Sequence, residues 1–121
     1  MRKWIGMLVA VCTILTTVPA LAHPKLVKAQ PAKGAILKKA PTKIQLWFHE
    51  ELDTKLSRFT VLNPKSERVD NGDGKVNLDE RKMMEGSVRS LPAGAYTVKW
   101  KAAGDDDKAV VEGTLTFRIR E

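Results

Sequence analysis

The sequence predicts an all-β protein, a β-sandwich of about seven short strands. Apolar and polar residues alternate with a period of two in several segments, which places successive side chains on opposite faces of a sheet. Proline and glycine separate these segments at the spacing of turns. No segment has the 3.6-residue apolar period of a long helix, although Leu78–Met84 is expected to form a helical turn. Many short strands without long helices favour a sandwich.

The first half of the chain contains three expected strands. Lys25–Gln30 forms the first and is followed by a loop over residues 31–42 that contains proline and glycine. Lys43–His49 forms the second, and its alternation places one apolar set on a single face: Ile44, Leu46 and Phe48. Arg58–Leu62 forms the third, which ends at the dipeptide Asn63–Pro64.

The second half contains the strands with the clearest pattern. A polar hairpin is expected around Asn71–Gly74, and Ser87–Leu91 forms the next strand. Ala95–Ala102 is the clearest strand of the chain, and residues 110–120 form the closing strand. The apolar residues that alternate in these last two strands are Tyr96, Val98, Trp100, Leu115, Phe117 and Ile119.

Residues 1–22 have the pattern of a secretory signal peptide. Two basic residues precede an apolar run of roughly 15 residues, shorter than the roughly 20 that a membrane-spanning helix needs. An Ala-Leu-Ala motif, typical of a signal peptidase site, ends at Ala22. We therefore expect cleavage after Ala22 and an exported domain, residues 23–121, that begins with His23.

The composition limits what this domain can do. Residues 23–121 suffice for one domain with one modest core. The single cysteine, Cys12, lies in the predicted signal peptide, so the domain has neither a disulfide nor a thiolate ligand. Two of the 21 Lys and Arg residues also lie there, which lowers the net charge from +7 to +5. Because the cations are scattered and the protein is exported, we expect no nucleic-acid partner, but a soluble monomer without stable membrane insertion.

A histidine at the start of the mature chain is a candidate copper ligand. A free α-amine and an imidazole on His23 would form a two-nitrogen chelate. Cu(II) can also recruit a deprotonated backbone amide from the second residue, but Pro24 has no N–H to lose. Two further ligands would then come from elsewhere in the fold. The alternative is that cleavage leaves a histidine first without any role in metal binding.

Several motifs together resemble the CopC family of periplasmic copper-resistance and copper-carrier proteins. The match covers nearly all of residues 23–121 and is weakest over residues 65–85. The resemblance implies an immunoglobulin-like, cupredoxin-like Greek-key sandwich. The segments that carry it are His23–Leu26, Gln30–Ala35, Ala40–Pro41, Leu46–Glu50, Leu91–Lys101 and Gly113–Phe117.

The resemblance also implies a set of copper ligands. In that family the amino-terminal histidine binds Cu(II) with an Asp-x-His motif before the last strand, and an acidic residue from the second strand lies nearby. Here His23 matches the amino-terminal histidine, and Glu50 matches the acidic residue of the second strand. Asp107 aligns with the motif's aspartate. The distal histidine is replaced by Ala109. Asp105 and Asp106 are alternatives to Asp107 for the motif's aspartate, because the loop is shifted by one residue. We expect the lost imidazole to weaken the site.

His49 is a second candidate for the missing nitrogen ligand. It directly precedes Glu50, so in a regular strand the two side chains point to opposite faces. Both could serve one ion only at a bulge or at the end of a strand. The alternative is a surface histidine that shares a face with Trp47. The two methionines of the domain, Met83 and Met84, are expected to fill gaps in the core.

A separate segment, residues 69–80, resembles a calcium-binding loop. Asn71, Asp73 and Glu80 occupy ligand positions of the pattern D-x-[DN]-x-[DN]-G-x5-E. Its first ligand position holds Val69, which cannot coordinate, and the entering helix is absent. The alternative is a turn in which glycine supplies the positive φ.

These observations predict a copper protein of the periplasm and not an enzyme. The leading hypothesis is a carrier that sequesters or delivers Cu(II) in copper resistance or homeostasis through His23, Asp107 and Glu50. One alternative keeps the fold as an adaptor with a degenerate copper site, which serves a membrane copper transporter or another envelope partner. Another alternative is a calcium-binding module that uses residues 69–80.

Overall fold

The computed structural model describes residues 23–121, and these form an all-β protein, as predicted. The predicted signal peptide lies outside the described residues. Within residues 23–121 no helix is long and apolar enough to cross a membrane. The strands are β1 Leu26–Gln30, β2 Ile36–Leu37, β3 Lys43–Phe48, β4 Arg58–Leu62, β5 Lys75–Val76, β6 Met83–Ser87, β7 Gly94–Ala103 and β8 Val110–Ile119.

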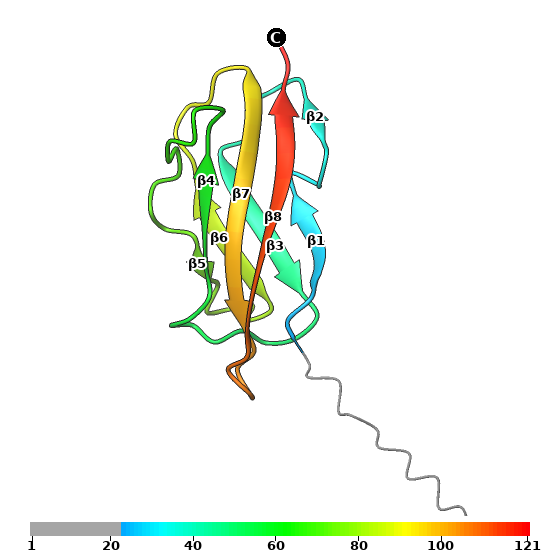
Figure 1. Cartoon of the computed structure of the whole chain (residues 1–121), viewed down its shortest axis with the longest axis vertical. Helices are drawn as coiled ribbons and strands as arrows, with labels where there is room; N and C mark the ends of the chain where they lie inside the picture. The colour runs from blue at the N-terminus through cyan, green and yellow to red at the C-terminus, as the bar shows by residue number, and fades with distance from the viewer. Residues whose placement is uncertain (1–22) are drawn as a thin grey trace, which may run out of the picture.

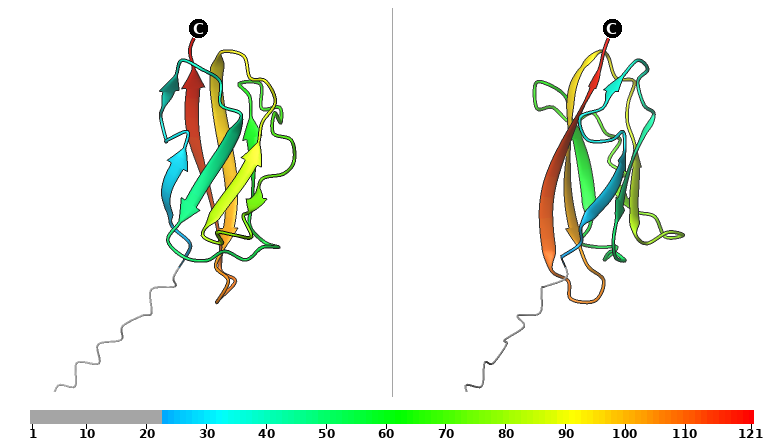
Figure 2. Two further views of the ribbon diagram at one scale, coloured as in Figure 1. Left: turned by 180° about the vertical axis from the view of Figure 1, so that it is seen from behind. Right: turned by 90° about the vertical axis from the view of Figure 1, so that its right-hand side faces the viewer.

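The strands form one hydrogen-bonded sheet that curls into two facing layers. Its order is β1-β3-β6-β5-β4-β7-β8-β2, and all neighbours are antiparallel except β2, which runs parallel to β8. One layer contains β1, β3 and β6, and the other contains β4, β7 and β8 (Figures 1 and 2). The short strand β5 connects the two layers.

The core lies between the layers and is built from the alternating residues that the sequence predicts. Ile44 and Leu46 on β3 are 0% exposed, and Phe48 is 2% exposed. Tyr96 and Val98 on β7 and three residues on β8 are also buried: Leu115, Phe117 and Ile119. Met84 is fully buried among them, which confirms the packing role expected of the methionines. Within residues 23–121 the eight strands therefore share one sheet and one hydrophobic core.

Two predicted elements near the middle of the chain are wrong. The strand expected over Ser87–Leu91 lies earlier, at β6, where Met83–Ser87 pairs with β3. The helical turn expected over Leu78–Met84 is instead a turn between β5 and β6, in which Asn77 Oδ1 accepts hydrogen bonds from the N–H groups of Asp79 and Glu80. Both consecutive methionines of β6 are buried, so this strand has no alternation that a period of two could reveal.

Two further strands were not predicted because each has only two residues. β2 lies inside the segment expected to be a loop, and Ile36 is 66% exposed although it pairs with β8. β5 follows the glycine-rich turn and pairs with both β4 and β6. A strand of two residues is too short to show a period.

The ends of three segments meet at one end of the molecule. β3 ends at Phe48, and the loop that follows it begins with His49 and Glu50. The loop between β7 and β8 and the segment that leads into β1 lie at this same end (Figure 2). The segments at this end of the molecule carry the residues that the sequence predicts as copper ligands.

Candidate metal centre

Backbone hydrogen bonds fix the loop after β3 against the loop after β7. Asp53 N–H donates to the carbonyl of Ala103 at 2.8 Å, and Asp105 N–H donates to the carbonyl of Glu51 at 3.0 Å. Leu52, which is 0% exposed, forms a β-bridge with Gly104 beneath them. The two acidic loops are therefore held side by side by the fold itself.

The amino-terminal segment is attached to the same loop through His49. Lys25 N–H donates to His49 Nδ1 at 2.8 Å, and His49 N–H donates to the Lys25 carbonyl at 3.0 Å. His23 precedes Lys25 by two residues, which span at most about 7 Å. Pro24 between them is buried, and His23 is exposed. His23 is therefore held within reach of the residue that follows His49.

His49 lies just beyond the end of β3 at Phe48. Outside a regular strand, the side chains of His49 and Glu50 can point to the same side. Its Nε2 lies 3.8 Å from Glu50 Oε2. Because Nδ1 accepts a hydrogen bond, the neutral ring carries its proton on Nε2. A metal ion at Nε2 would have to displace that proton, and one at Nδ1 would break the contact with Lys25. The ring of Trp47 is covered by the ammonium group of Lys28, 4.7 Å from the ring centroid.

Glu50 carries a buried oxygen that has no partner. Its Oε1 atom is inaccessible to solvent and makes no hydrogen bond within residues 23–121. A Cβ atom on Gly104 would collide with this oxygen and would lie 3.0 Å from Asp107 Oδ1. The oxygens of Glu50 and Asp107 therefore approach the same point beside Gly104. An unpaired buried carboxylate oxygen is costly, and a bound cation would remove that cost.

Asp105 forms ion pairs with two cations. Its Oδ1 lies 3.2 Å from Arg81 Nη2 and 3.4 Å from Lys108 Nζ. Lys108 also lies 2.8 Å from Asp53, and this contact, with N–H groups from Leu56 and Lys55, lowers the pKa of Asp53 to about 2. Asp105 therefore stabilises the loop and is not a free carboxylate.

Acidic residues from both loops, Glu50 and Asp105 among them, line an open cleft of about 280 Å³. Its lining comprises His49, Glu50, Glu51, Lys82, Asp105 and Asp106. No group of three or more His, Cys, Asp or Glu side chains that could hold a metal ion is formed in the part of the chain that the structure describes. At the position of the missing distal histidine, Ala109 N–H donates to Asp107 Oδ1 at 3.0 Å. The loop therefore offers oxygen donors, and nitrogen donors would have to come from His23.

The calcium-type segment is not arranged as a calcium loop. Asp73 accepts hydrogen bonds from Ser87 N–H at 2.8 Å and from the Ser87 hydroxyl at 2.7 Å. Asn71 donates to the same hydroxyl at 2.9 Å. Glu80 lies in the turn before Met83, at the opposite end of β6 from Ser87. The structure therefore does not bring Glu80 to Asn71 and Asp73.

Sequence reasoning missed the residues that hold the site together. Gly104, Arg81 and Lys108 were not singled out, because each acts through a neighbour that is distant in the sequence. The one available signal was charge: Lys108 directly follows the acidic run of the β7–β8 loop.

Comparisons with known proteins find similar sequences over most of this chain. A family model for the CopC domain matches residues 26–120. Copper resistance protein C of Pseudomonas syringae pv. tomato is 31% identical over 113 residues, which cover 88% of this chain and 88% of that protein. The copper transport protein CutJ of Bacillus subtilis is 28% identical over 119 residues, which cover 98% of this chain. The chain spans only 21% of the length of CutJ.

Solved structures share the fold. PcoC, a methionine-rich copper resistance protein from Escherichia coli, is 32% identical, with a TM-score of 0.65 over 82% of this chain and 100% of PcoC. CopC from Methylosinus trichosporium OB3b has a TM-score of 0.70 at 23% identity, over 80% of this chain and 93% of that one. These likenesses confirm the expected cupredoxin-like β fold.

Proposed function

The chain belongs to the CopC family, and from this premise we propose that it binds Cu(II) in the periplasm and sequesters the ion or delivers it. Its relatives are named for copper resistance and copper transport, which supports a copper-related role. The observation that carries the proposal is the buried, unpartnered Oε1 of Glu50 beside Asp107 at Gly104.

The proposed ligands come from two sources. The amine and imidazole of His23 supply two nitrogens, and Glu50 and Asp107 supply oxygens. Cu(II) accepts such a mixed nitrogen and oxygen set, and it binds more tightly than other divalent first-row metals to almost any ligand set. Glu50 is partly buried, with its Oε1 atom inaccessible to solvent, whereas Asp107 lies on an exposed loop.

The proposal requires removal of residues 1–22, because only cleavage after Ala22 gives His23 a free amine. Mass spectrometry of the protein recovered from the cell envelope tests this step. A first residue of His23 is the expected result. Any other first residue contradicts the nitrogen chelate while leaving the fold unaffected.

In this proposal His49 positions the site and does not bind the ion. Its Nδ1 holds the segment that carries His23, and its Nε2 faces Glu50 Oε2. Groups of this kind orient metal ligands without touching the metal. His49 would thereby connect the two sources of ligands.

A site with one imidazole instead of two suits a carrier. The exchange of an imidazole for oxygen donors lowers copper affinity, and a weaker site releases its ion more readily to an acceptor. We propose a membrane copper transporter as that acceptor, and binding without catalysis. If copper binds only weakly and without His23, the adaptor function of the same fold remains; the hydrogen bond that Ala109 makes to Asp107 is the observation that favours it.

Titration of metal-free residues 23–121 with Cu(II) against a competing chelator tests the ligand set. Glu50→Gln and Glu51→Gln change the charge equally in the same cleft, but only Glu50 has the buried oxygen. Glu50→Gln is expected to weaken binding about tenfold or more, and Glu51→Gln to change it less than about twofold. Equal effects of the two substitutions would contradict the proposed site.

A further inference from the structure

A row of unpaired cations crosses the outer face of the sheet on adjacent strands. Arg58 on β4 is in register with Lys75 on β5 and with Lys101 on β7. Lys99 projects from the same face of β7 and is in register with Thr60. None of these four cations forms an ion pair within residues 23–121. Like charges directly opposite each other destabilise a sheet, and Arg58 has a cation on each side. The row is bounded by carboxylates, because Lys75 is also in register with Glu85 and Lys101 with Glu112.

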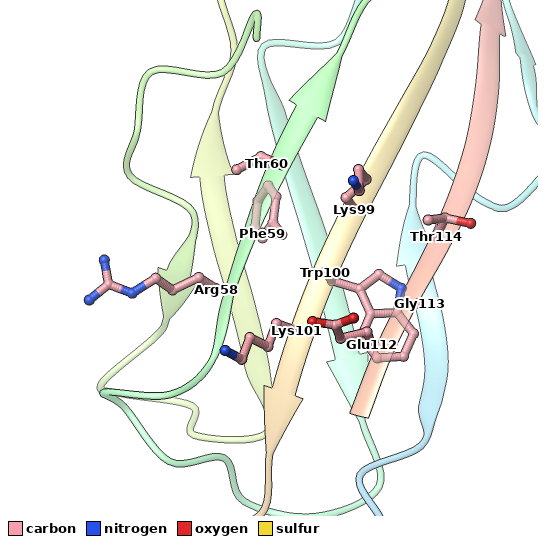
Figure 3. Close-up of a pocket in the computed structure, with 9 residues that line it drawn as sticks. All are labelled: Arg58, Phe59, Thr60, Lys99, Trp100, Lys101, Glu112, Gly113 and Thr114. Carbon is pink, nitrogen blue, oxygen red and sulfur yellow. The ribbon is translucent and has the colours of Figure 1, made fainter. Parts of the chain in front are cut away.

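The cations border two adjoining recesses in this face. One recess, of about 430 Å³, is lined by Arg58, Thr60, Lys99, Lys101, Glu112 and Thr114 around Trp100 (Figure 3). The other, of about 440 Å³, shares Arg58 and Thr60 and includes Lys75. We call the surface formed by Lys75, Arg58, Lys101 and Lys99 the basic groove.

The Trp100 side chain lies on the core face of β7, in register with the buried Phe59, and so on the opposite face from Lys99 and Lys101. A Cβ atom on Gly113 would collide with the indole ring, so the glycine leaves the space that the ring fills. The indole also packs edge to face on Phe48, with 5.2 Å between ring centroids. Its Nε1 is buried without a hydrogen-bond partner in the described part of the chain. The Trp100 ring therefore supports the recess from the core side, and the outer face of the recess combines cationic and hydroxyl groups with the carboxylate of Glu112.

We infer that the basic groove is a docking surface for a carboxylate-rich segment of a partner protein. Carboxylates placed among Lys75, Arg58 and Lys101 would neutralise the charges that repel one another in the free domain. A flat anionic membrane fits less well, since it would reach only the tips of side chains that surround a recess. Residues 1–22 cannot be the occupant, because they contain basic residues and no acidic ones.

The groove adjoins the candidate metal centre. Lys101 precedes Ala103 by two residues on β7, and the carbonyl of Ala103 binds the loop after β3. A partner in the groove would therefore lie beside the cleft formed by the two acidic loops. Complementary charge of this kind speeds the encounter of two proteins and fixes their orientation. The inference rests on the charges of the sheet face and does not require bound copper.

The test uses isotope-labelled, metal-free residues 23–121 and a blocked peptide of eight glutamates. Nuclear magnetic resonance titration is expected to shift amide signals of β4, β7 and β8 around Arg58, Lys101 and Gly113. Arg58→Glu should weaken binding at least about tenfold, whereas Lys33→Glu, an equal change at an exposed loop position, should change it less than about twofold. Arg58→Glu should also raise the thermal midpoint, because it places an anion between Lys75 and Lys101, so lost binding would not reflect unfolding.

Three outcomes would overturn the inference. Equal effects of Arg58→Glu and Lys33→Glu would show that binding follows only the net charge. Stronger binding to phosphatidylglycerol vesicles than to the peptide, with the same dependence on Arg58, would assign the groove to a membrane. Self-association lost in Arg58→Glu, measured by sedimentation, would assign it to the acidic end of a second copy.

Discussion

Glu50 fills the space that a side chain on Gly104 would occupy. The glycine lies where the loop after β7 is bridged to Leu52, and the carboxylate of Glu50 lies over it, close to Asp107. The glycine provides room for the buried oxygen, and the Asp107 oxygen beside it adds a like charge whose repulsion a bound cation would relieve. The copper proposal depends on this relationship.

Gly104→Ala should therefore weaken copper binding. The added methyl group would push Glu50 out of position, which should lower copper affinity about tenfold and reduce stability by about 1–3 kcal/mol. Chelator competition and thermal unfolding measure the two effects. In a Glu50→Gln background the same substitution should have little further effect on affinity. Full additivity of the two changes would show that Gly104 and Glu50 act separately.

His49→Ala should lower copper affinity without changing the number of bound nitrogens. The His49 ring holds the segment that carries His23 and faces Glu50. Its loss would disorder the site and lower the copper affinity about tenfold. The nitrogen splitting in the electron paramagnetic spectrum of the Cu(II) protein should stay as in the wild type, whereas His23→Ala should reduce it to that of the α-amine nitrogen alone. Loss of one nitrogen in His49→Ala would identify His49 as a ligand.

Asp53 should stabilise the domain at neutral pH and lose this effect in acid. Its contact with Lys108, together with N–H groups from Leu56 and Lys55, lowers its pKa from 3.8 to about 2. A carboxyl group with a lowered pKa stabilises the folded state at pH values above its ordinary pKa, and this stabilisation disappears as the pH falls through about 2. The difference in thermal midpoint between wild type and Asp53→Asn should be constant above pH 5 or so and should shrink below about pH 4. The exposed Asp106→Asn is the control, and a difference that does not depend on pH would contradict the assignment.

Asp70→Ala should be among the more destabilising single substitutions outside the apolar core. The Asp70 side chain is 1% exposed and accepts hydrogen bonds from Val61 N–H, Gly72 N–H and the Arg68 guanidinium. Its removal leaves the buried Val61 N–H unsatisfied, at a cost of about 3 kcal/mol in the free energy of unfolding. Denaturant unfolding measures this change. Asp79→Ala, in an exposed turn, should change stability by less than about 0.5 kcal/mol, and similar values for both would refute the structural role of Asp70.

The sequence correctly predicts the strands that bury one face. Prediction from alternation fails where buried and exposed residues do not alternate. Alternation on β3, β7 and β8 identifies the core correctly, because each of these strands has one face on the core. β6 has two buried methionines in succession and a glycine, so its position was set by pairing with β3. Such pairing between distant segments is not visible in a local pattern.

The candidate metal site was likewise predictable from the sequence only in part. His23, Glu50 and Asp107 were identified from motifs, and the structure places the oxygens of the latter two around Gly104. The contact between Lys25 and His49 and the ion pairs of Asp105 could not be predicted, since both depend on how loops far apart in the chain meet. These ion pairs engage Oδ1 of Asp105, and the assignment of Asp105 as a ligand stays a prediction.

The most direct measurement compares two forms of residues 23–121 that differ only at the α-amine of His23. Each is titrated with Cu(II) against a competing chelator, and its electron paramagnetic spectrum is recorded. The free-amine form should bind one Cu(II) tightly with a nitrogen-rich spectrum, and acetylation of the amine should lower the affinity about a hundredfold or more. Equal affinity and identical spectra for the free and acetylated forms would contradict the proposed copper site.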